Sequence, residues 1–431
     1  MLPSTKAEAL AFLHGRSPST MVFGLERVQR ALDELGHPEL RFPAVHVAGT
    51  NGKGSTCAMV DAVLRAAGFR VGLYTSPHLV RFNERIRIGG QDIDDDRLGG
   101  LLLELLRRSP AATELTYFEL ATAAAFLHFA EERVDWAVLE TGLGGRLDAT
   151  ATCRPRVTGI TALGLDHTEL LGHSLASIAR EKAGILRPGV PAVVAEQPPE
   201  AMEVLVVEAA RVGAPLLRQG VDFSLSPLGR RLVYRQGTRR LEGLTLGLHG
   251  DHQRGNAAVA LAMLEALRAR GEAIPEGSLL AGLRDVRWPG RLEEVPGRPL
   301  LLLDGAHNPA GVEALRAALD GAYAGRRMHL VFGVVREKEI GPMLARLLPR
   351  MASATFTTLD TPRALAPEAY LESARSLLVD VAIAASPGEA LARARARAGP
   401  EDVVLVAGSL YLVGEVKAHL ASGEAPGRTN G

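Results

Sequence analysis

The chain has 431 residues, 47% of them apolar, and its 49 basic side chains are balanced by 49 acidic ones. At roughly 150 residues per domain, this length predicts two or three domains, and the apolar content excludes a disordered chain. The charge balance gives no support for a nucleic-acid or anionic-membrane partner. We also expect no membrane span, because no apolar run approaches the roughly 20 residues required, and the N-terminus lacks a secretory signal pattern.

The two cysteines, Cys57 and Cys153, have no metal-ligand spacing and are too few for a disulfide framework. We therefore expect reduced thiols in a cytoplasmic enzyme.

Apolar β-prone runs alternate with helical patterns along most of the chain, which is typical of α/β architecture with mainly parallel sheets. The early strands are expected at 44–48, 71–74, 135–140, 157–162 and 191–195, and the early helices at 55–67, 118–132 and 174–184. Short polar–apolar alternation over 223–248 predicts a small antiparallel sheet, and a helix is expected over 253–270.

The segment from Glu294 to Pro299 contains two prolines and a glycine, which interrupt both helix and strand. A second alternation follows it, with strands expected at 300–303, 328–333, 352–358, 379–384 and 403–406. Pro309 suits the first turn of a helix, where its missing N–H costs nothing. We predict a P-loop ATPase-type domain with a mainly parallel sheet over 1–296 and a smaller Rossmann-like α/β domain over 297–431.

A glycine-rich loop, Gly49-Thr50-Asn51-Gly52-Lys53-Gly54-Ser55, follows the strand at 44–48 and precedes a helix. This context favours phosphate binding, because glycines expose backbone N–H groups and the helix N-terminus attracts anions. Lys53 would neutralise the β- and γ-phosphates. The spacing departs from the usual Walker A pattern, since Val47 replaces its first glycine and Gly54 separates Lys53 from the hydroxyls.

A magnesium nucleotide needs oxygen ligands, and Glu140 ends an apolar strand whose carboxyl end should line the ligand crevice. The glycines at 142, 144 and 145 would allow the backbone to approach a ligand closely. Asp166-His167 follows another strand at the same edge. Lys182 lies near a helix C-terminus, where a simple favourable interaction with the helix dipole is the alternative to a functional role. The acidic run Asp92 to Asp96 is better explained as a solvated loop and helix N-cap than as a metal site.

These segments together resemble the Mur ligase relatives, whose phosphate loops share the departures from Walker A. Among these relatives the chain is similar to the folylpolyglutamate synthase family, which is often bifunctional with dihydrofolate synthase. Supporting segments occur in the family's order along nearly the whole chain: 24–28, 75–79, 116–119, 140–150, 166–167, 181–185, 288–291, 304–309 and 408–411. Ala151 departs from the pattern, because many relatives have Asn there.

The resemblance implies roles for individual residues. The expected nucleotide-binding residues are Asn51, Gly52, Lys53, Gly54, Ser55, Asn256, Arg291, Asp304 and His307. The expected magnesium ligands, for two ions, are Ser55, Ser76, Glu140, His167 and a carbamylated Lys182. The residues expected to border the pterin acceptor are Gly24, Leu25, Tyr117, Phe118, Glu119, Leu147, Asp148 and Ala149. The central catalytic residues would be Lys53, Glu140, His167 and Lys182.

The implied reaction is ATP-driven addition of L-glutamate to a folate through an acyl phosphate, and whether dihydropteroate is also an acceptor stays open. We expect a monomer with small-molecule substrates. One alternative is a peptidoglycan-precursor Mur ligase, although only 48 residues precede Gly49, too few for the extra domain of those enzymes. The other alternative is a P-loop nucleotide switch, which would not explain the second α/β domain.

Overall fold

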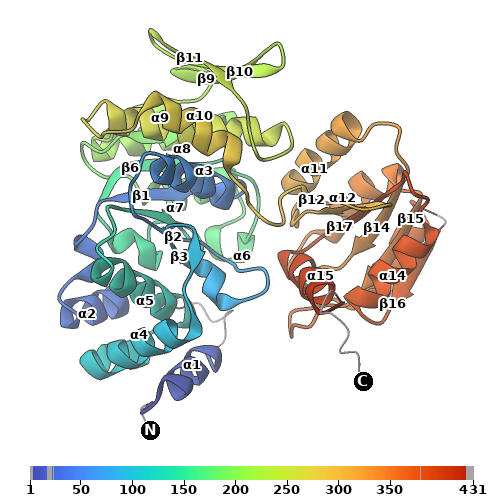
Figure 1. The fold of residues 1–431 in the computed structure, drawn as a ribbon, viewed down its shortest axis with the longest axis horizontal. Coiled ribbons are helices and arrows are strands. Elements are labelled where there is room, and N and C mark those ends of the chain that lie inside the picture. Colours follow the sequence, from blue (N-terminus) through green and yellow to red (C-terminus); the bar gives the residue numbers. More distant parts are fainter. Residues whose placement is uncertain (1–2, 17–21, 23, 379, 424–431) are drawn as a thin grey trace, which may run out of the picture. The chain divides into compact units, whose positions relative to one another are not determined.

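The computed structural model describes residues 3–16, 22, 24–378 and 380–423. The chain divides into two compact units. The first contains Met1–Pro77, Asn83–Gly247 and Gln253–Arg287, and the second contains His78–Phe82, Leu248–His252 and Trp288–Gly431. Each unit is an α/β structure built on its own sheet (Figure 1). The fold class predicted from the sequence is confirmed.

The first unit is built on an eight-stranded sheet in the order β4-β3-β2-β5-β1-β6-β7-β8. The strands are β1 (Ala44–Ala48), β2 (Val71–Tyr74), β3 (Ile86–Ile88), β4 (Gln91–Asp92), β5 (Trp136–Glu140), β6 (Pro155–Ile160), β7 (Ala192–Val194) and β8 (Leu216–Arg218). All neighbours from β2 to β8 pair in parallel, and β3 and β4 form an antiparallel edge. The central strand β1 is buried along its whole length, as expected for a strand covered by helices on both faces.

Helices cover both faces of this sheet. They are α1 (Lys6–His14), α2 (Glu26–Glu34), α3 (Lys53–Ala66), α4 (Asp95–Arg108), α5 (Tyr117–Glu131), α6 (Thr168–Leu171), α7 (Leu175–Ala183), α8 (Pro199–Val212), α9 (His252–Arg268) and α10 (Glu276–Asp285). Figure 1 shows α3, α9 and α10 on one side of the sheet and α4 and α5 on the other. The expected N-cap in the acidic run is Asp94, whose side chain accepts from Arg97 N–H at the start of α4.

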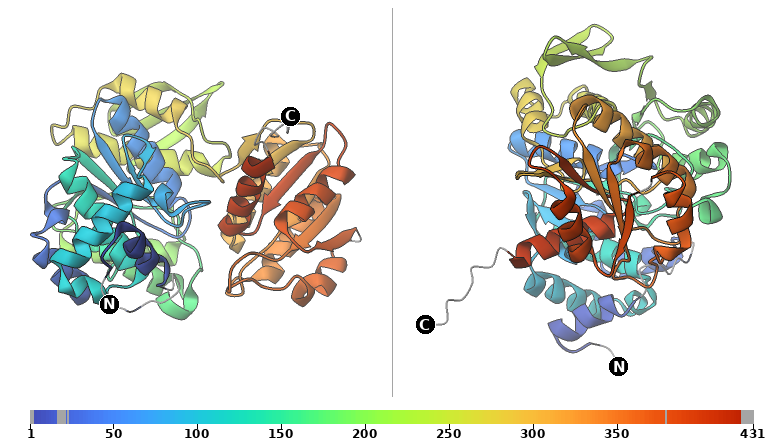
Figure 2. Two further views of the ribbon diagram at one scale, coloured as in Figure 1. Left: turned by 60° about the horizontal axis from the view of Figure 1, so that its bottom comes forward. Right: turned by 90° about the vertical axis from the view of Figure 1, so that its right-hand side faces the viewer.

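The predicted antiparallel sheet is present as β9 (Phe223–Leu228), β10 (Arg231–Gln236) and β11 (Arg239–Leu244), joined by two short turns. It projects from the rest of the first unit (Figure 2). In this part of the chain the switch from a helical period to strict alternation located the sheet correctly.

The second unit has a six-stranded sheet in the order β12-β13-β17-β14-β15-β16. Its strands are β12 (Glu293–Val295), β13 (Leu300–Leu303), β14 (Met328–Phe332), β15 (Ser353–Thr357), β16 (Val381–Ala384) and β17 (Val403–Ala407). Only β12 is antiparallel. The predicted domain boundary at 296/297 falls in the turn between β12 and β13, because β12 folds back onto this second sheet.

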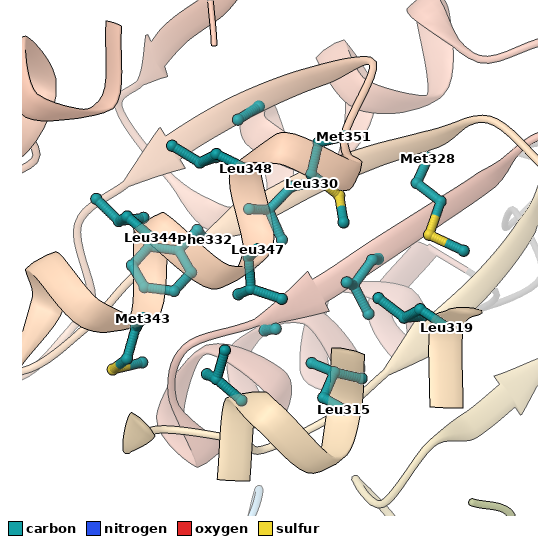
Figure 3. Close-up of a cluster of buried hydrophobic side chains, with 14 of the residues drawn as sticks. Leu315, Leu319, Met328, Leu330, Phe332, Met343, Leu344, Leu347, Leu348 and Met351 are labelled. Atoms are coloured by element: carbon teal, nitrogen blue, oxygen red, sulfur yellow. The ribbon is translucent and has the colours of Figure 1, made fainter. Parts of the chain in front are cut away.

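The helices of the second unit are α11 (Pro309–Ala322), α12 (Ile340–Leu347), α13 (Glu368–Arg375), α14 (Pro387–Arg397) and α15 (Leu410–Gly423). Pro309 is the first residue of α11, as expected, and Asn308 caps the helix by accepting from Gly311 N–H. Side chains of α11 and α12 close one face of the sheet over Leu330 and Phe332 (Figure 3). Among the described residues, no helix combines the length and the apolar character needed to cross a bilayer.

Candidate active site

The glycine-rich loop connects β1 to α3 in the conformation that its sequence predicts. Gly49 and Gly52 have φ angles of 152° and 88°, in the region that favours glycine. A Cβ on Gly52 would lie 2.2 Å from Oδ1 of Asn256, so α9 closes against the loop at a distance only glycine permits. The N–H groups of Thr50 and Asn51 both donate to Ala162 O at 3.1 Å, which fixes the loop to the chain after β6. The loop thus leads into the first turn of α3, and a helix N-terminus favours anions.

Lys53 and Glu140 come together at the carboxyl edge of the sheet, as the sequence predicted. Lys53 Nζ lies 4.0 Å from Glu140 Oε1 and donates to Thr50 O at 3.3 Å. The second carboxylate oxygen of Glu140 accepts from Ser76 N–H at 3.1 Å. Glu140 is buried and Lys53 is largely buried, so a charge placed here is weakly screened by solvent. The arrangement places a cation and a carboxylate next to the phosphate loop.

The hydroxyl of Ser55 is connected to α9 through Gln253, a residue that the sequence did not suggest. Gln253 Nε2 donates to Ser55 Oγ at 3.3 Å, and Asn256 Nδ2 donates to Gln253 Oε1 at 2.9 Å. The only signal in the sequence is that Gln253 and Asn256 are three residues apart on one predicted helix, and thus share a face. The structure therefore places Asn256, expected at the nucleotide, directly beside the loop.

Lys182 is a buried amine rather than a solvated cation at a helix end, because only 3% of the residue is exposed. Burial, with a further contribution from the charge of Lys53, lowers the pKa of Lys182 to about 7. Asp148, Asp166 and Glu181 oppose that shift without cancelling it. A substantial fraction of this amine is therefore uncharged and nucleophilic at neutral pH.

The segment following Glu140 uses its glycines for packing. A Cβ on Gly142 would lie 2.5 Å from the Phe118 ring, and one on Gly145 would lie 2.9 Å from Glu181 O at the end of α7. Glycine at 142 and 145 thus makes room for Phe118 and for the end of α7, and the expectation that the backbone here approaches a ligand stays a prediction. Asp148 ties the segment together by accepting from the N–H groups of Gly142 and Leu143 at 2.8 and 3.0 Å. Leu147 is half-buried beside it and Ala149 is buried.

Asp166 and His167 follow β6 at the same edge of the sheet. His167 has a φ of 50° and precedes the short helix α6, and its backbone N–H donates to Asp166 Oδ1 at 2.9 Å. The imidazole Nε2 lies 3.9 Å from that same carboxylate oxygen, and 40% of the His167 side chain is exposed. The imidazole of His167 therefore lies partly exposed beside a carboxylate at this edge of the sheet.

Besides the segment at 147–149, the residues expected to border the acceptor lie at the N-termini of α2 and α5. Gly24, with a φ of 122°, and Leu25 precede α2. Glu119 completes a capping box with Thr116 at the start of α5, and it also accepts from Arg27 Nη2 at 2.9 Å. The two aromatic residues at this helix start pack locally: Tyr117 lies under the Arg85 guanidinium, and Phe118 lies against Tyr74.

The remaining predicted nucleotide residues belong to the second unit. Asp304 is buried and accepts from the N–H groups of Leu292 and Ala306, both at 2.9 Å. His307 Nδ1 lies 2.8 Å from Gly305 O, and Arg291 Nη1 donates to Gly290 O at 3.1 Å. These contacts make Asp304 the organising residue of the segments on either side of β12 and β13.

Within the described part of the chain, no cluster of three or more His, Cys, Asp or Glu side chains is arranged to hold a metal ion. The predicted ligand set instead combines one carboxylate, one imidazole and two hydroxyls, from Glu140, His167, Ser55 and Ser76, with a carbamylated Lys182 as the fifth member. The carboxylate and hydroxyl oxygens in this set suit a hard cation such as magnesium, which commonly takes its remaining ligands from substrate phosphates and water.

Comparison with known proteins identifies the family. Residues 47–264 match the Mur ligase middle domain, and residues 290–410 match the Mur ligase glutamate ligase domain. A dihydrofolate synthase/folylpolyglutamate synthase from Bacillus subtilis is 38% identical, with 96% of this chain and 98% of that protein covered. The chain belongs to the folylpolyglutamate synthase/dihydrofolate synthase family of Mur ligases. The family resemblance noted in the sequence is therefore confirmed, and so is the enzyme class, an ATP-dependent ligase.

Two solved structures of this family match nearly the whole fold. The Escherichia coli enzyme FolC, in complex with DHPP and ADP, has a TM-score of 0.88 at 35% identity, covering 97% of this chain and 98% of FolC. The bifunctional folylpolyglutamate synthase/dihydrofolate synthase of Yersinia pestis, complexed with AMPPNP and a Mn ion, also has a TM-score of 0.88, at 34% identity. The match covers 98% of this chain and 100% of the Yersinia pestis chain.

Proposed function

We propose that this enzyme adds L-glutamate to a folate acceptor at the expense of ATP. The observation that carries the proposal is the meeting of Lys53, Glu140 and a glycine-rich helix N-terminus, in a chain that matches folylpolyglutamate synthases over nearly its full length. ATP would lie along the loop from Asn51 to Ser55, with its phosphates at the N-terminus of α3.

The reaction has two chemical steps, and each makes a separate demand on the enzyme. The acceptor carboxylate attacks the γ-phosphate of ATP, giving an acyl phosphate and ADP, and Lys53 offsets the negative charge on the transferring phosphoryl oxygens. The amine of L-glutamate then attacks the acyl carbon, an amide bond forms and phosphate leaves. The acyl phosphate must be kept from water between these steps.

A divalent ion, expected to be magnesium, would be held by Ser55, Ser76, Glu140 and His167. Support comes from the donor set described above and from the Yersinia pestis relative, which was solved with a Mn ion. When bound, such an ion would supply further positive charge to the phosphates. We propose that Asn256, Arg291, Asp304 and His307 serve the nucleotide, and that the segments at 24–25, 117–119 and 147–149 border the acceptor.

We further propose that Lys182 is carbamylated. Its amine is buried and has a pKa of about 7, so the uncharged form needed for attack on carbon dioxide is well populated. As an ammonium group Lys182 is repelled by Lys53, whereas the carbamate would be an anion attracted to Lys53 and repelled by Asp148, Asp166 and Glu181, so a bound cation would favour the carbamate. The modified side chain would offer oxygen donors for a second divalent ion, which an arginine could not provide.

A product assay tests the reaction. Purified enzyme would be incubated with Mg-ATP, L-glutamate and either tetrahydrofolate or dihydropteroate in separate reactions. The masses of the products would be measured by mass spectrometry. Gain of one glutamyl residue on either acceptor supports the proposal and shows which acceptor is used. If neither acceptor gains mass while ATP is hydrolysed, the folate ligase function is wrong.

The same assay addresses the alternatives. A peptidoglycan-precursor ligase would leave both folate acceptors unchanged, and a P-loop switch would hydrolyse ATP without regard to them. Both alternatives are less well supported than a folate ligase, since relatives named for folate acceptors match the chain over nearly its whole length. The monomeric state and the cytoplasmic location remain predictions.

A further inference from the structure

A buried polar residue interrupts the apolar central strand. His46 lies in the middle of β1, two residues from the end of the strand that enters the phosphate loop, and it is fully buried. Burial, and the nearby charge of Arg187, lower the pKa of His46 to about 3, so the imidazole is neutral and carries one N–H. A buried imidazole in a strand otherwise filled by Ala and Val costs desolvation energy unless it makes a specific contact.

That contact is with Thr150, in the 3₁₀ turn Ala149–Thr152. His46 Nε2 lies 2.8 Å from Thr150 Oγ1, and the Thr150 hydroxyl in turn donates to Asp148 Oδ1. The backbone N–H of Thr150 donates to the same oxygen at 3.0 Å. The chain of hydrogen bonds therefore runs from the central strand, through one hydroxyl, to the carboxylate of Asp148.

The direction of each hydrogen bond follows from the groups available. Burial raises the pKa of Asp148, but three backbone N–H groups, of Gly142, Leu143 and Thr150, donate to its two oxygens and favour the ionised carboxylate, which then also accepts from the Thr150 hydroxyl. The single hydroxyl proton of Thr150 is used on Asp148, and therefore His46 must donate from Nε2–H. The proton-free Nδ1 is then the buried ring atom without a partner, and a buried acceptor is better tolerated than a buried donor.

Asp148, at the far end of this series of hydrogen bonds, also holds the segment from 142 to 148. Through its second oxygen, Asp148 holds the N–H groups of Gly142 and Leu143, and Arg146 N–H donates to Glu181 O at 2.9 Å beside Lys182. The segment from 142 to 148 is thus fixed at one end by Asp148 and at its middle by α7.

We propose that His46 is a positioning residue for the acceptor: through Thr150 it orients Asp148 and holds the segment 142–148 in the form that binds the folate. This inference rests on the proposed function, since it assigns the segment at 147–149 to the acceptor. His46 contacts neither substrate nor phosphate in this account and acts only through Thr150.

The test uses two pairs of variants in the full-length enzyme. His46→Leu and Thr150→Val remove one link each, whereas His46→Gln and Thr150→Ser keep an N–H or a hydroxyl at the same place. His329→Leu is the matched control: His329 is an equally buried strand histidine, 2.8 Å from Ser353 Oγ and 3.1 Å from Asp402 Oδ2, in the second unit.

Two readouts distinguish positioning from general loss of structure. Amide hydrogen exchange at Gly142 and Leu143 should become on the order of tenfold faster in His46→Leu and Thr150→Val, the effect of losing one buried hydrogen bond. The KM for the folate acceptor should rise by a similar factor, while the KM for ATP changes less than about twofold. The Gln and Ser variants should stay within about threefold of wild type, and the double variant should be no worse than either single one.

The inference is overturned if exchange at Gly142 and Leu143 is unchanged, if the two losses simply add, or if His329→Leu raises the acceptor KM as much. Should His46→Leu fail to fold, the comparison of Thr150→Val with Thr150→Ser decides the question alone. Absence of folate- and glutamate-dependent turnover in the wild type would instead show that the proposed function is wrong. The exchange measurement separates the two failures because it requires no turnover.

Discussion

Lys53 Nζ lies 4.0 Å from Glu140 Oε1, so the cation of the phosphate loop faces the carboxylate that ends the neighbouring strand. Each has a second anchor, Thr50 O for the lysine and Ser76 N–H for the glutamate. The pair is thereby held in place before any nucleotide binds, which is the preorganisation that phosphoryl transfer requires.

Replacing Lys53 with Met should lower the rate of folate-dependent ADP release by about 10²- to 10³-fold, because one preorganised charge at the phosphates is lost. A coupled ADP assay measures the rate, and circular dichroism checks the fold. Lys6→Met is the matched control, since Lys6 is half-exposed and pairs with Asp96 at the surface. A Lys53→Met enzyme with near wild-type turnover would mean that the phosphates bind elsewhere.

Gly52→Ala should abolish measurable ATP binding, because its Cβ would lie 2.2 Å from Asn256 Oδ1 and α9 would have to move away from the loop. Gly68→Ala is the matched control: its φ of 92° carries the same backbone strain, about 1–2 kcal/mol, but its Cβ would meet nothing within 4 Å. Titration calorimetry with ATP compares the two. Equal loss of binding in both variants would point to backbone strain alone.

Lys182 should make the folded state more stable as pH rises. Its pKa is about 7 in the folded chain and 10.5 when unperturbed, so the unfolded chain binds the extra proton between these values. The free-energy cost of burying the charged Lys182 amine is therefore complete below pH 7, and it disappears towards pH 10.5, where the amine is neutral in both states. In buffers freed of carbon dioxide, Lys182→Met should therefore stabilise the first unit at pH 7, by on the order of 4 kcal/mol, and much less at pH 10. Urea unfolding at both pH values checks this, and a pH-independent difference would contradict it.

The chemical role of Lys182 gives a different expectation. Lys182→Ala should fold but lose activity, and a small carboxylate such as acetate should restore part of it by standing in for the carbamate. Lys182→Arg should be inactive despite its positive charge, because guanidinium does not form the carbamate. Steady-state assays of both variants, with and without acetate, provide the measurement. An active Lys182→Arg enzyme would rule out carbamylation.

Features that depend on local sequence could be predicted well. The buried strands at 44–48 and 300–303 are short apolar runs between turn residues, and the cap at Asp94 and the helix start at Pro309 follow from backbone chemistry. The phosphate loop and Glu140 could be placed at one edge because parallel strands present their carboxyl ends together.

Features that depend on tertiary structure could not be predicted. Nothing local indicates that residues 78–82 and 248–252 join the second unit, or that the polar pair Glu293 and Glu294 forms an edge strand. The burial of Lys182 and the contact of Gln253 with Ser55 arise between segments far apart in the chain. The role of His46 could not be predicted either, because a single histidine within an apolar strand does not change the pattern that predicts the strand.

The most direct test of the account is ADP release by the purified enzyme with Mg-ATP, measured with and without a folate acceptor and with and without L-glutamate. We predict that sustained turnover needs both, because the acyl phosphate forms only on the acceptor carboxylate and is discharged only by the glutamate amine. Turnover that is the same in the absence of both substrates would contradict the assignment of this chain as a glutamate-adding ligase.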